Sequence, residues 1–291
     1  MFLRRGRIIR SSYRTRERRK TFLFRLFFLP VALTALVALG AFLAHRPEVI
    51  IRDISVQGTL ALAEDDIRRV VHEEISGAYL RFFPRANSLL YPRKEIEERL
   101  KNTFPLLSSV TVRFKNFHSI VVVVEERKPA HLWCGEELLA RKGVPPECFF
   151  LDSDGVVFAR APLFSTGVYL SLYGPIAGGT VREGNVHETP LGFYFLTTQD
   201  FHFLVAFAGA MKELGAVPEK IFVMGDGDYN VILANGVSLL INQKHGLDSL
   251  VGNLEAALQT DKLTTEDVVG ERSRLEYIDV RFKNKVLYKF K

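Results

Sequence analysis

Hydrophobic and polar residues follow three different patterns along the chain, and the first is an uninterrupted apolar run near the N-terminus. Residues 26–44 contain no charged side chain, and eleven of these nineteen residues are Leu, Phe or Val. At a rise of 1.5 Å per residue they make a helix of about 28 Å, close to the roughly 30 Å hydrocarbon core of a bilayer. The run therefore predicts one transmembrane helix over residues 26–45.

The segment from residue 48 to residue 129 mixes strand and helix periods. Helical spacing of apolar residues predicts one amphipathic helix at 63–76 and a second after Pro92. Strand-like, β-branched runs lie at 49–56, 108–114 and 119–129. The helix residues expected to face inward are Ile67, Val70, Val71, Ile75, Ile96 and Leu100. The order strand, helix, helix, strand, strand predicts a small α+β layer, with a three-stranded sheet under two helices.

Residues 130–291 are dominated by short strand-like runs, which two helical patterns interrupt. The helical patterns cover 199–214, which Gly215 closes, and roughly 247–260. Asn235-Gly236 between two apolar runs is the strongest short hairpin signal. The strand-like runs are 148–159, 168–174, 220–225, 229–242 and 275–291. They predict a mostly antiparallel β domain with two helices, since the strands are too few for a transmembrane barrel.

The net charge of +6 is unevenly distributed along the chain. Residues 1–25 hold ten Lys or Arg and only Glu17, so this tail carries +9 and the rest of the chain carries −3. A basic balance that resides in the tail argues against nucleic-acid binding by the folded part. Because basic residues that flank a span stay in the cytoplasm, we expect the tail inside, against anionic lipids, and residues 48–291 outside the cytoplasmic membrane.

Two targeting alternatives compete with a permanent anchor. Ala38-Leu39-Gly40 is a marginal small-x-small cleavage site, although signal peptides have a shorter apolar region of about 7–15 residues. Arg18-Arg19 ahead of Phe22-Leu23 resembles a twin-arginine signal, with the spacing off by one. The anchor is the interpretation that fits both the length of the run and the position of the charge.

The two cysteines, Cys134 and Cys148, lie on the side of the membrane that we expect to be exported. In an oxidising compartment, a pair that encloses a loop with Gly and Pro suits a disulfide, worth roughly 3 kcal/mol in the chain-entropy model. Two free thiols are the alternative, because spacing does not show that the sulfur atoms meet.

The sequence displays no motif for catalysis or for a cofactor. It has no G-x-S-x-G elbow, no phosphate-binding loop, no H-E-x-x-H and no C-x-x-C. Asp152-Ser153-Asp154-Gly155 resembles the start of a calcium loop, but Leu163 stands where Glu is needed, so a turn is favoured, as at Asp226-Gly227-Asp228. The histidines, none at metal-ligand spacing, are at 45, 72, 118, 131, 187, 202 and 245. We therefore expect no enzymatic activity, cofactor, metal or small-molecule substrate.

The C-terminal run has the two-residue period of a β hairpin. In its first strand, the core face is expected to carry Ile278, Val280 and Phe282, and the other face Tyr277, Asp279 and Arg281. In its second strand, Val286, Tyr288 and Phe290 alternate with Lys285, Leu287, Lys289 and Lys291. If this strand lies at the sheet edge, its unpaired backbone groups can accept a strand from a partner. The alternative is a lysine-protected edge that pairs with nothing.

The first half of the chain resembles a known family. A single span, followed by a unit similar to a POTRA domain at 48–129 that ends in Glu126-Arg127-Lys128-Pro129, is similar to the FtsQ/DivIB cell-division proteins. This ending is moderately specific. POTRA units also occur in outer-membrane assembly and secretion proteins, so the second half of the chain must distinguish these families.

The second half of the chain contains the most specific part of the resemblance. The strand Tyr277-Ile278-Asp279-Val280-Arg281-Phe282 resembles the final hairpin of FtsQ proteins, and a D-x-x-G hairpin is present at Asp152 and Gly155. The sequence departs from the family in the last turn, where Lys283-Asn284-Lys285 replaces the usual glycine. In all, the resemblance covers about residues 20–291.

The resemblance implies a non-enzymatic divisome scaffold at the division septum. Its implied partners are small bitopic proteins of the FtsB/FtsL type, bound at the C-terminal end. The residues expected at this contact are Tyr277, Asp279, Arg281, Phe282, Val286, Leu287 and Tyr288. Two alternatives are an assembly or secretion accessory that handles unfolded clients, and a membrane-anchored envelope hydrolase, which would need a cleft that holds His187, His202 and an acid.

Overall fold

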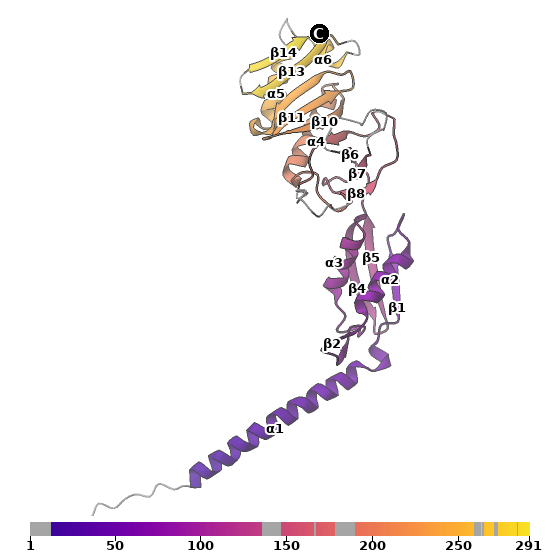
Figure 1. Cartoon of the computed structure of the whole chain (residues 1–291), viewed down its shortest axis with the longest axis vertical. Coiled ribbons are helices and arrows are strands. Elements are labelled where there is room, and N and C mark those ends of the chain that lie inside the picture. Colours follow the sequence, from indigo (N-terminus) through magenta and orange to yellow (C-terminus); the bar gives the residue numbers. More distant parts are fainter. Residues whose placement is uncertain are drawn as a thin grey trace, which may run out of the picture. The chain divides into compact units, whose positions relative to one another are not determined.

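The computed structural model describes residues 13–135, 147–165, 167–177, 190–258, 263, 265–270, 273–283 and 285–291, with residues 13–23 described as backbone only. The chain divides into two compact units (Figure 1). The first contains the residues up to Leu100 and Val110–Val124, and the second contains Lys101–Ser109 and Glu125–Lys291. Both contain helices and strands, as the predicted α+β class requires. Residues 1–12 of the predicted basic tail lie outside the described residues.

Helix α1 (Tyr13–Ala44) contains the segment Phe24–Ala44, which is long and apolar enough to cross a membrane. The predicted apolar helix is therefore confirmed. From Phe24 onward, every described side chain of α1 is exposed except at Gly40, Ala41 and Ala44. An apolar surface of this extent is unfavourable in water and suits contact with lipid.

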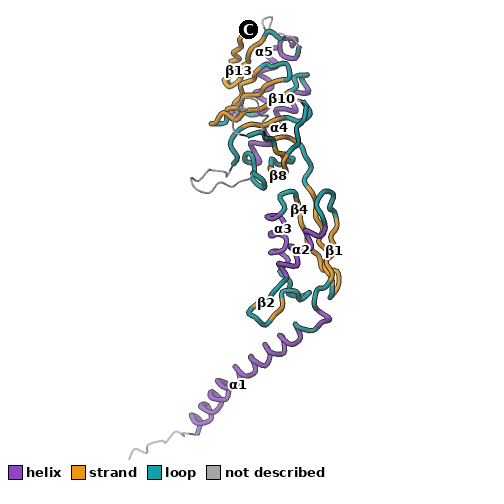
Figure 2. The backbone as a smooth tube through the Cα atoms, turned by 45° about the vertical axis from the view of Figure 1, so that its right-hand side comes forward, coloured by secondary structure: helices purple, strands orange, loops and turns teal. Residues whose placement is uncertain are grey.

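A three-stranded sheet and two helices form the body of the first unit. Their bounds are β1 (Asp53–Gln57), α2 (Glu64–Ile75), α3 (Arg93–Thr103), β4 (Leu107–Asn116) and β5 (Ser119–Glu126). The strand order is β1-β5-β4, with β1 and β5 parallel, and α2 and α3 accompany the sheet (Figure 2). The buried helix residues are those that the periodicity predicts: Ile67, Val70, Val71, Ile75, Ile96 and Leu100. The three-stranded sheet and the two helices agree with the sequence pattern.

The segments next to α1 differ from the prediction. The predicted strand at 49–56 begins only at Asp53, because Pro47–Val49 form a short 3₁₀ helix and the N–H of Ile51 donates to the carbonyl of Ala86 at 2.8 Å. A small hairpin of β2 (Ala78–Tyr79) and β3 (Phe83–Pro84) lies between α2 and α3, and the sequence pattern does not predict it. Its turn contains no Gly, Asn or Asp, which are the usual hairpin signals.

The second unit is built on one nine-stranded sheet. Its strands are β6 (His131–Trp133), β7 (Phe149–Leu151), β8 (Val157–Arg160), β9 (Ser171–Tyr173), β10 (Pro218–Gly225), β11 (Asp228–Leu233), β12 (Ser238–Asn242), β13 (Leu275–Phe282) and β14 (Lys285–Phe290). The order is β14-β13-β12-β11-β10-β9-β6-β7-β8. Five of the eight neighbouring pairs are antiparallel, so the sheet is mixed but mostly antiparallel.

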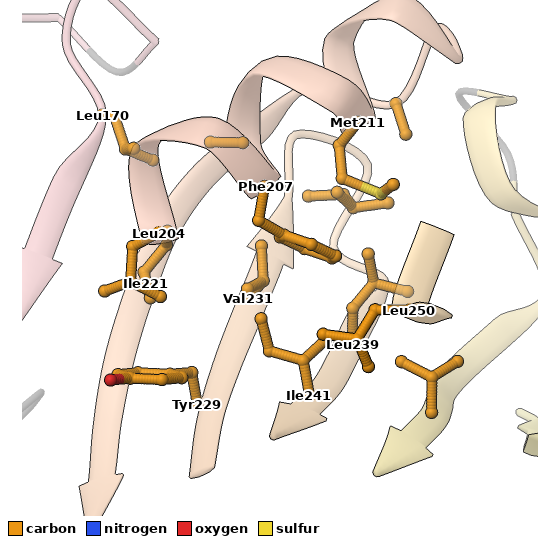
Figure 3. Packing of buried hydrophobic residues seen from close by; sticks show 14 of the residues in the cluster. Leu170, Leu204, Phe207, Met211, Ile221, Tyr229, Val231, Leu239, Ile241 and Leu250 are labelled. Carbon is orange, nitrogen blue, oxygen red and sulfur yellow. The ribbon is translucent and has the colours of Figure 1, made fainter. Parts of the chain in front are cut away.

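Helices of the second unit supply the other side of its core. They are α4 (Thr198–Glu213), the 3₁₀ turn η2 (Gln243–His245), α5 (Leu247–Leu258) and α6 (Thr265–Val269). The patterns at 199–214 and 247–260 correctly predict α4 and α5, although residues 259–262 lie outside the described part. Figure 3 shows Phe207 and Met211 of α4 above Val231 and Leu239 of the sheet, all fully or nearly fully buried. This core holds the C-terminal strands in place.

Two sequence motifs meet in a buried ion pair. A guanidinium nitrogen of Arg127, from the Glu-Arg-x-Pro sequence, donates to Asp152, whose side chain is 7% exposed. The other Asp152 oxygen accepts the N–H groups of Asp154 and Val156 at 3.0 and 2.9 Å, which closes the turn between β7 and β8. Nε of Arg127 donates to the carbonyl of Pro105 at 3.1 Å. The Glu-Arg-x-Pro motif and the turn at Asp152 are therefore joined, and the Asp152 carboxylate stabilises the turn between β7 and β8.

The structure joins Cys134 and Cys148 in a disulfide. Cys134 is buried next to Leu132 and Tyr173, at the end of β6. The sequence leaves two alternatives open, a disulfide or two free thiols, and the structure contains the disulfide. The bond links the segment after β6 to the segment before β7, and the strands β6 and β7 pair with each other. It therefore fastens the two ends of a loop whose residues 136–146 are outside the described part.

His131 gives the second unit a pH dependence that can be measured. Burial, and after it the charge of Lys212, lowers the pKa of His131 to about 4. Its ring Nδ1 is buried without a hydrogen-bond partner among the described residues. In the unfolded chain the pKa of His is about 6.5. Because the unfolded state binds the proton more readily, stability present above pH 6.5 is lost as the pH falls toward 4.

We predict that the free energy of unfolding of the purified full-length protein decreases between pH 7 and pH 5, and that His131→Asn makes this decrease smaller. Denaturant titration at several pH values measures the effect. His202→Asn is the control, since the side chain of His202 is 55% exposed. A decrease of the same size in His131→Asn and in the parent protein would contradict the assignment.

Candidate partner-binding edge

The C-terminal strand β14 forms one edge of the nine-stranded sheet. It pairs with β13 in an antiparallel register, and among the described strands none lies on its other side. The N–H of Lys291 donates to the carbonyl of Arg274 at 2.7 Å. Since N–H and C=O groups of successive residues in a strand point to opposite sides, the odd-numbered residues of β14 turn toward β13. The backbone groups of Val286, Tyr288 and Phe290 consequently point to the open edge.

The side chains of this strand divide between the core and the surface. Val286 and Tyr288 pack partly against the hydrophobic core, while Leu287 is half-buried. Phe290 is 37% exposed and stacks edge-on with Tyr288 at a ring-centroid distance of 5.7 Å. The edge therefore offers open backbone groups beside apolar side chains, which is the combination that strand addition uses.

Phe282 does not lie in the core, which corrects the expectation from the two-residue period. Its side chain is 47% exposed, whereas Ile278 and Val280 are buried as expected. The register is irregular between Asp279 and Phe282: over this stretch β13 advances by three residues while β14 advances by two. A bulge of this kind interrupts the alternation, so Phe282 does not continue the buried face of Ile278 and Val280.

Asp279 and Arg281 are engaged within the fold instead of projecting freely from the outer face. Arg281 Nε and Nη2 donate to the two Asp279 oxygens at 2.9 and 2.7 Å, and its Nη1 donates to Asp228 at 2.9 Å. Asp279 is only 5% exposed. His245 contacts the carbonyl of Arg281 at 2.6 Å through Nε2, and Asn253 donates to the carbonyl of Lys283 at 3.1 Å. The charged residues predicted at the partner contact thus position the hairpin.

Electrostatics stabilise this cluster in its charged form. Burial by itself would raise the pKa of Asp228, but hydrogen bonds from Asn242 and Arg281, with the charges of Arg281 and Lys244, outweigh it and lower the pKa below its usual range. The hydrogen bond to Asp279 raises the pKa of Arg281 further, against a smaller effect of burial. The charged forms of Asp228 and Arg281 are therefore both favoured by this arrangement.

The residues that hold the hairpin from outside it do not follow from the sequence pattern. The pattern places Asp228 in a turn, and nothing in it distinguishes Asn242 or Asn253 from other polar residues. The pairing of Asp228 with Arg281 spans 53 residues of sequence. The one available signal was the position of Asp228 at the start of a predicted strand, next to two turn residues.

The remaining polar candidates form no chemical site in the described part of the chain. His202 and Asp154 approach to 3.5 Å, but both side chains are more than half exposed. His187, the other histidine required by the hydrolase hypothesis, lies outside the described residues. Within the described part of the chain, no three His, Cys, Asp or Glu side chains are arranged to hold a metal ion.

We predict that Arg281→Gln destabilises the full-length protein by on the order of 3 kcal/mol, at the low end for a broken buried ion pair because Arg281 is partly exposed. The cause is that the buried Asp279 carboxylate loses the guanidinium that donates to both of its oxygens. Lys289→Gln is the matched control, since it breaks the exposed 2.6 Å pair with Glu276 in the same hairpin and should have a much smaller effect. Denaturant unfolding measures both, and equal effects would contradict the positioning role of Arg281.

Comparison of the sequence with models of known protein families finds no match, and no curated protein matches it.

Proposed function

We propose that this protein is a non-enzymatic, membrane-anchored scaffold of the bacterial divisome, similar to the FtsQ/DivIB proteins. In this proposal α1 crosses the cytoplasmic membrane with the N-terminal tail inside, and the folded units act outside, at the division septum. The open edge of β14 is the observation that carries the proposal. It offers one face of backbone hydrogen-bonding groups to a strand from a small bitopic partner of the FtsB/FtsL type.

The architecture of the first unit supports the POTRA part of this proposal. A strand, two helices and two further strands follow the apolar helix, and β1 pairs in parallel with β5. The Glu-Arg-x-Pro sequence stands at the end of β5, where Arg127 bonds to the turn between β7 and β8. Two of the motifs that carry the family resemblance, Glu-Arg-x-Pro and D-x-x-G, are therefore in direct contact.

The charge around the edge favours an acidic partner. Lysines surround the open strand, and one of them is paired with Glu276; they are Lys283, Lys285, Lys289 and Lys291. Lysines at an edge oppose pairing with a second copy of the same strand, since like charges would then approach each other. A partner strand flanked by Asp or Glu would remove this repulsion and gain the opposite interaction. We therefore expect association with the partner to weaken as the salt concentration rises.

Confinement to the membrane makes an edge strand of modest intrinsic affinity sufficient for binding. Two proteins that are each held by one span in the same bilayer meet at a raised effective concentration. A short strand of six residues can then supply specificity without a large interface. An assembly accessory would use the same edge differently, because it would accept many extended peptides.

We predict that Val286→Pro abolishes co-purification of the partner from solubilised membranes, because proline removes an N–H that points to the open edge. The fold should remain, since proline is tolerated on an edge strand where its missing N–H faces outward. Val286→Ala is the matched control: it shortens the same side chain and keeps the N–H, so it should retain the partner.

Equal co-purification by the Val286→Pro and Val286→Ala proteins would exclude strand addition at β14. Competition with unrelated extended peptides separates the two binding hypotheses. Displacement of the partner by any such peptide would favour an assembly accessory, whereas resistance to them supports a scaffold for a defined partner.

A further inference from the structure

The hairpin of β2 and β3 lies against α1 inside the segment that can cross a membrane. A β-carbon built on Gly40 would be 3.8 Å from Cε1 of Phe83, so this ring packs on the helix at Gly40. The views in Figures 1 and 2 both place β2 next to the C-terminal end of α1. Gly40 and Ala44 lie one turn apart on the same face; Gly40 is half-buried and Ala44 is buried, whereas Leu39, Phe42 and Leu43 are exposed.

The depth of this contact follows from helix geometry. The segment Phe24–Ala44 has 21 residues, which makes about 31 Å of helix and matches the hydrocarbon core of a bilayer. Ala44 then lies near the hydrocarbon boundary, and Gly40 lies about 6 Å below it. A hairpin that touches Gly40 must consequently reach the membrane surface or enter it.

The side chains at the tip of the hairpin suit that depth. Leu80 is 83% exposed and Phe82 is 58% exposed, with Arg81 exposed between them. Nearby, Leu89 and Leu90 are 69% and 42% exposed. In water these groups would be an apolar patch next to a polar domain, whereas at a bilayer surface apolar and aromatic side chains enter the leaflet and Arg reaches the lipid phosphates.

The backbone of the turn gives independent support. Leu80 and Arg81 have φ angles of 49° and 67°, in the left-handed region, and the N–H of Phe82 donates to the carbonyl of Tyr79 at 3.0 Å. A turn with two such central residues normally uses Asn-Gly, because larger side chains are strained there. Folding alone therefore does not explain Leu and Arg at these positions, and a contact made by their side chains does.

The hairpin is held in place by the first unit. The N–H of Arg85 donates to the carbonyl of Gly77 at 3.1 Å, and its guanidinium donates to Glu74 at 2.8 Å and lies 5.4 Å from the centre of the Tyr79 ring. Asn87 donates to the carbonyl of Ala44, the last residue of α1, at 2.9 Å. The tip thus has a fixed height relative to the end of the helix.

An apolar hollow of about 470 Å³ lies between α1 and the segment after the hairpin. Its surface is mostly apolar, and its lining includes Gly40, Leu43, Phe83, Leu89 and Leu90, together with the polar residues Arg46, Glu48 and Asn87. A hollow with so apolar a lining is unfavourable when it is filled with water, and lipid chains at the same depth would fill it. The continuity of the hollow with the spanning helix favours lipid as its occupant.

We propose that the β2–β3 hairpin is a second membrane contact, in which Leu80 and Phe82 enter the leaflet beside α1 and Arg81 binds lipid phosphate. This inference rests on the membrane crossing in the proposed function. Its consequence is that the first unit is held at a set angle to the membrane by two points, the helix and the hairpin, and not by a single swivelling tether.

The test uses the full chain in phosphatidylcholine and phosphatidylglycerol vesicles. Leu80→Cys is labelled with an environment-sensitive fluorophore. Leu60→Cys is the matched control, because Leu60 is 87% exposed and follows the C-terminal end of β1, whereas α1 precedes the N-terminal end of that strand. The two native cysteines form a disulfide and therefore do not react with the thiol-directed fluorophore. We expect lipids brominated near the top of their acyl chains to quench most of the emission at 80, and aqueous iodide to quench only the label at 60.

Iodide quenching at 80 equal to that at 60 would overturn the proposal. Protection of the label at 80 from both quenchers would also overturn it, since a protein segment would then cover the hairpin. Vesicle flotation separates this result from the anchor itself: a chain that floats while its label at 80 is exposed to iodide contradicts the hairpin contact alone, whereas a chain that does not float contradicts the anchor.

A double variant tests the side chains at the tip without risk to the fold. Leu80→Asn with Arg81→Gly gives the turn the residues that it prefers. A label at Phe82→Cys should then become open to iodide, because the two residues that seek the membrane are gone. Unchanged lipid quenching in this variant would show that Leu80 and Arg81 do not hold the hairpin in the leaflet.

Discussion

The guanidinium of Arg281 is the interaction on which the C-terminal edge depends. It binds Asp279 on its own strand and Asp228 two strands away in the sheet. A hairpin at the end of a sheet is otherwise bonded to its neighbour on one side only and would fray easily. By crossing from β13 to β11, the ion pairs fix the hairpin from which β14 presents its open side. The charges of this cluster thus act within the protein, and the outward backbone groups of the neighbouring strand are the ones that we propose for partner binding.

The two ends of the chain solve related problems with different chemistry. At the C-terminus, the ion pairs of Arg281 fix the hairpin whose edge we propose as the partner-binding site. Near the membrane, apolar packing of Phe83 on Gly40 and the bond from Asn87 to Ala44 fix the hairpin against α1. In both places a small hairpin is held by contacts inside its own unit, and its outward-facing groups, the backbone of β14 and the side chains of Leu80 and Phe82, are the ones that we propose make contacts outside the chain. This organisation suits the binding role that we propose.

The sequence predicts those parts of the fold that depend on local periodicity. The inward face of α2 and the turn at Asn235-Gly236, where Gly236 has a φ of 84°, follow directly from spacing and residue type. The β2–β3 hairpin could not be predicted, because Leu80 and Arg81 are not turn residues. The position of Phe282 was wrong, since a bulge is a property of two paired strands and leaves no trace in the spacing of one. The Arg281 cluster could not be predicted either, because Arg281 and Asp228 are 53 residues apart in the sequence.

Hydrogen exchange of the β14 amides, with and without the bound partner, tests strand addition most directly. In the free protein the amides of the odd-numbered residues of β14 face β13, whereas those of Val286, Tyr288 and Phe290 face outward. The account predicts that binding slows exchange selectively at these three even-numbered residues. Exchange that stays fast at all three when the partner is bound would contradict it.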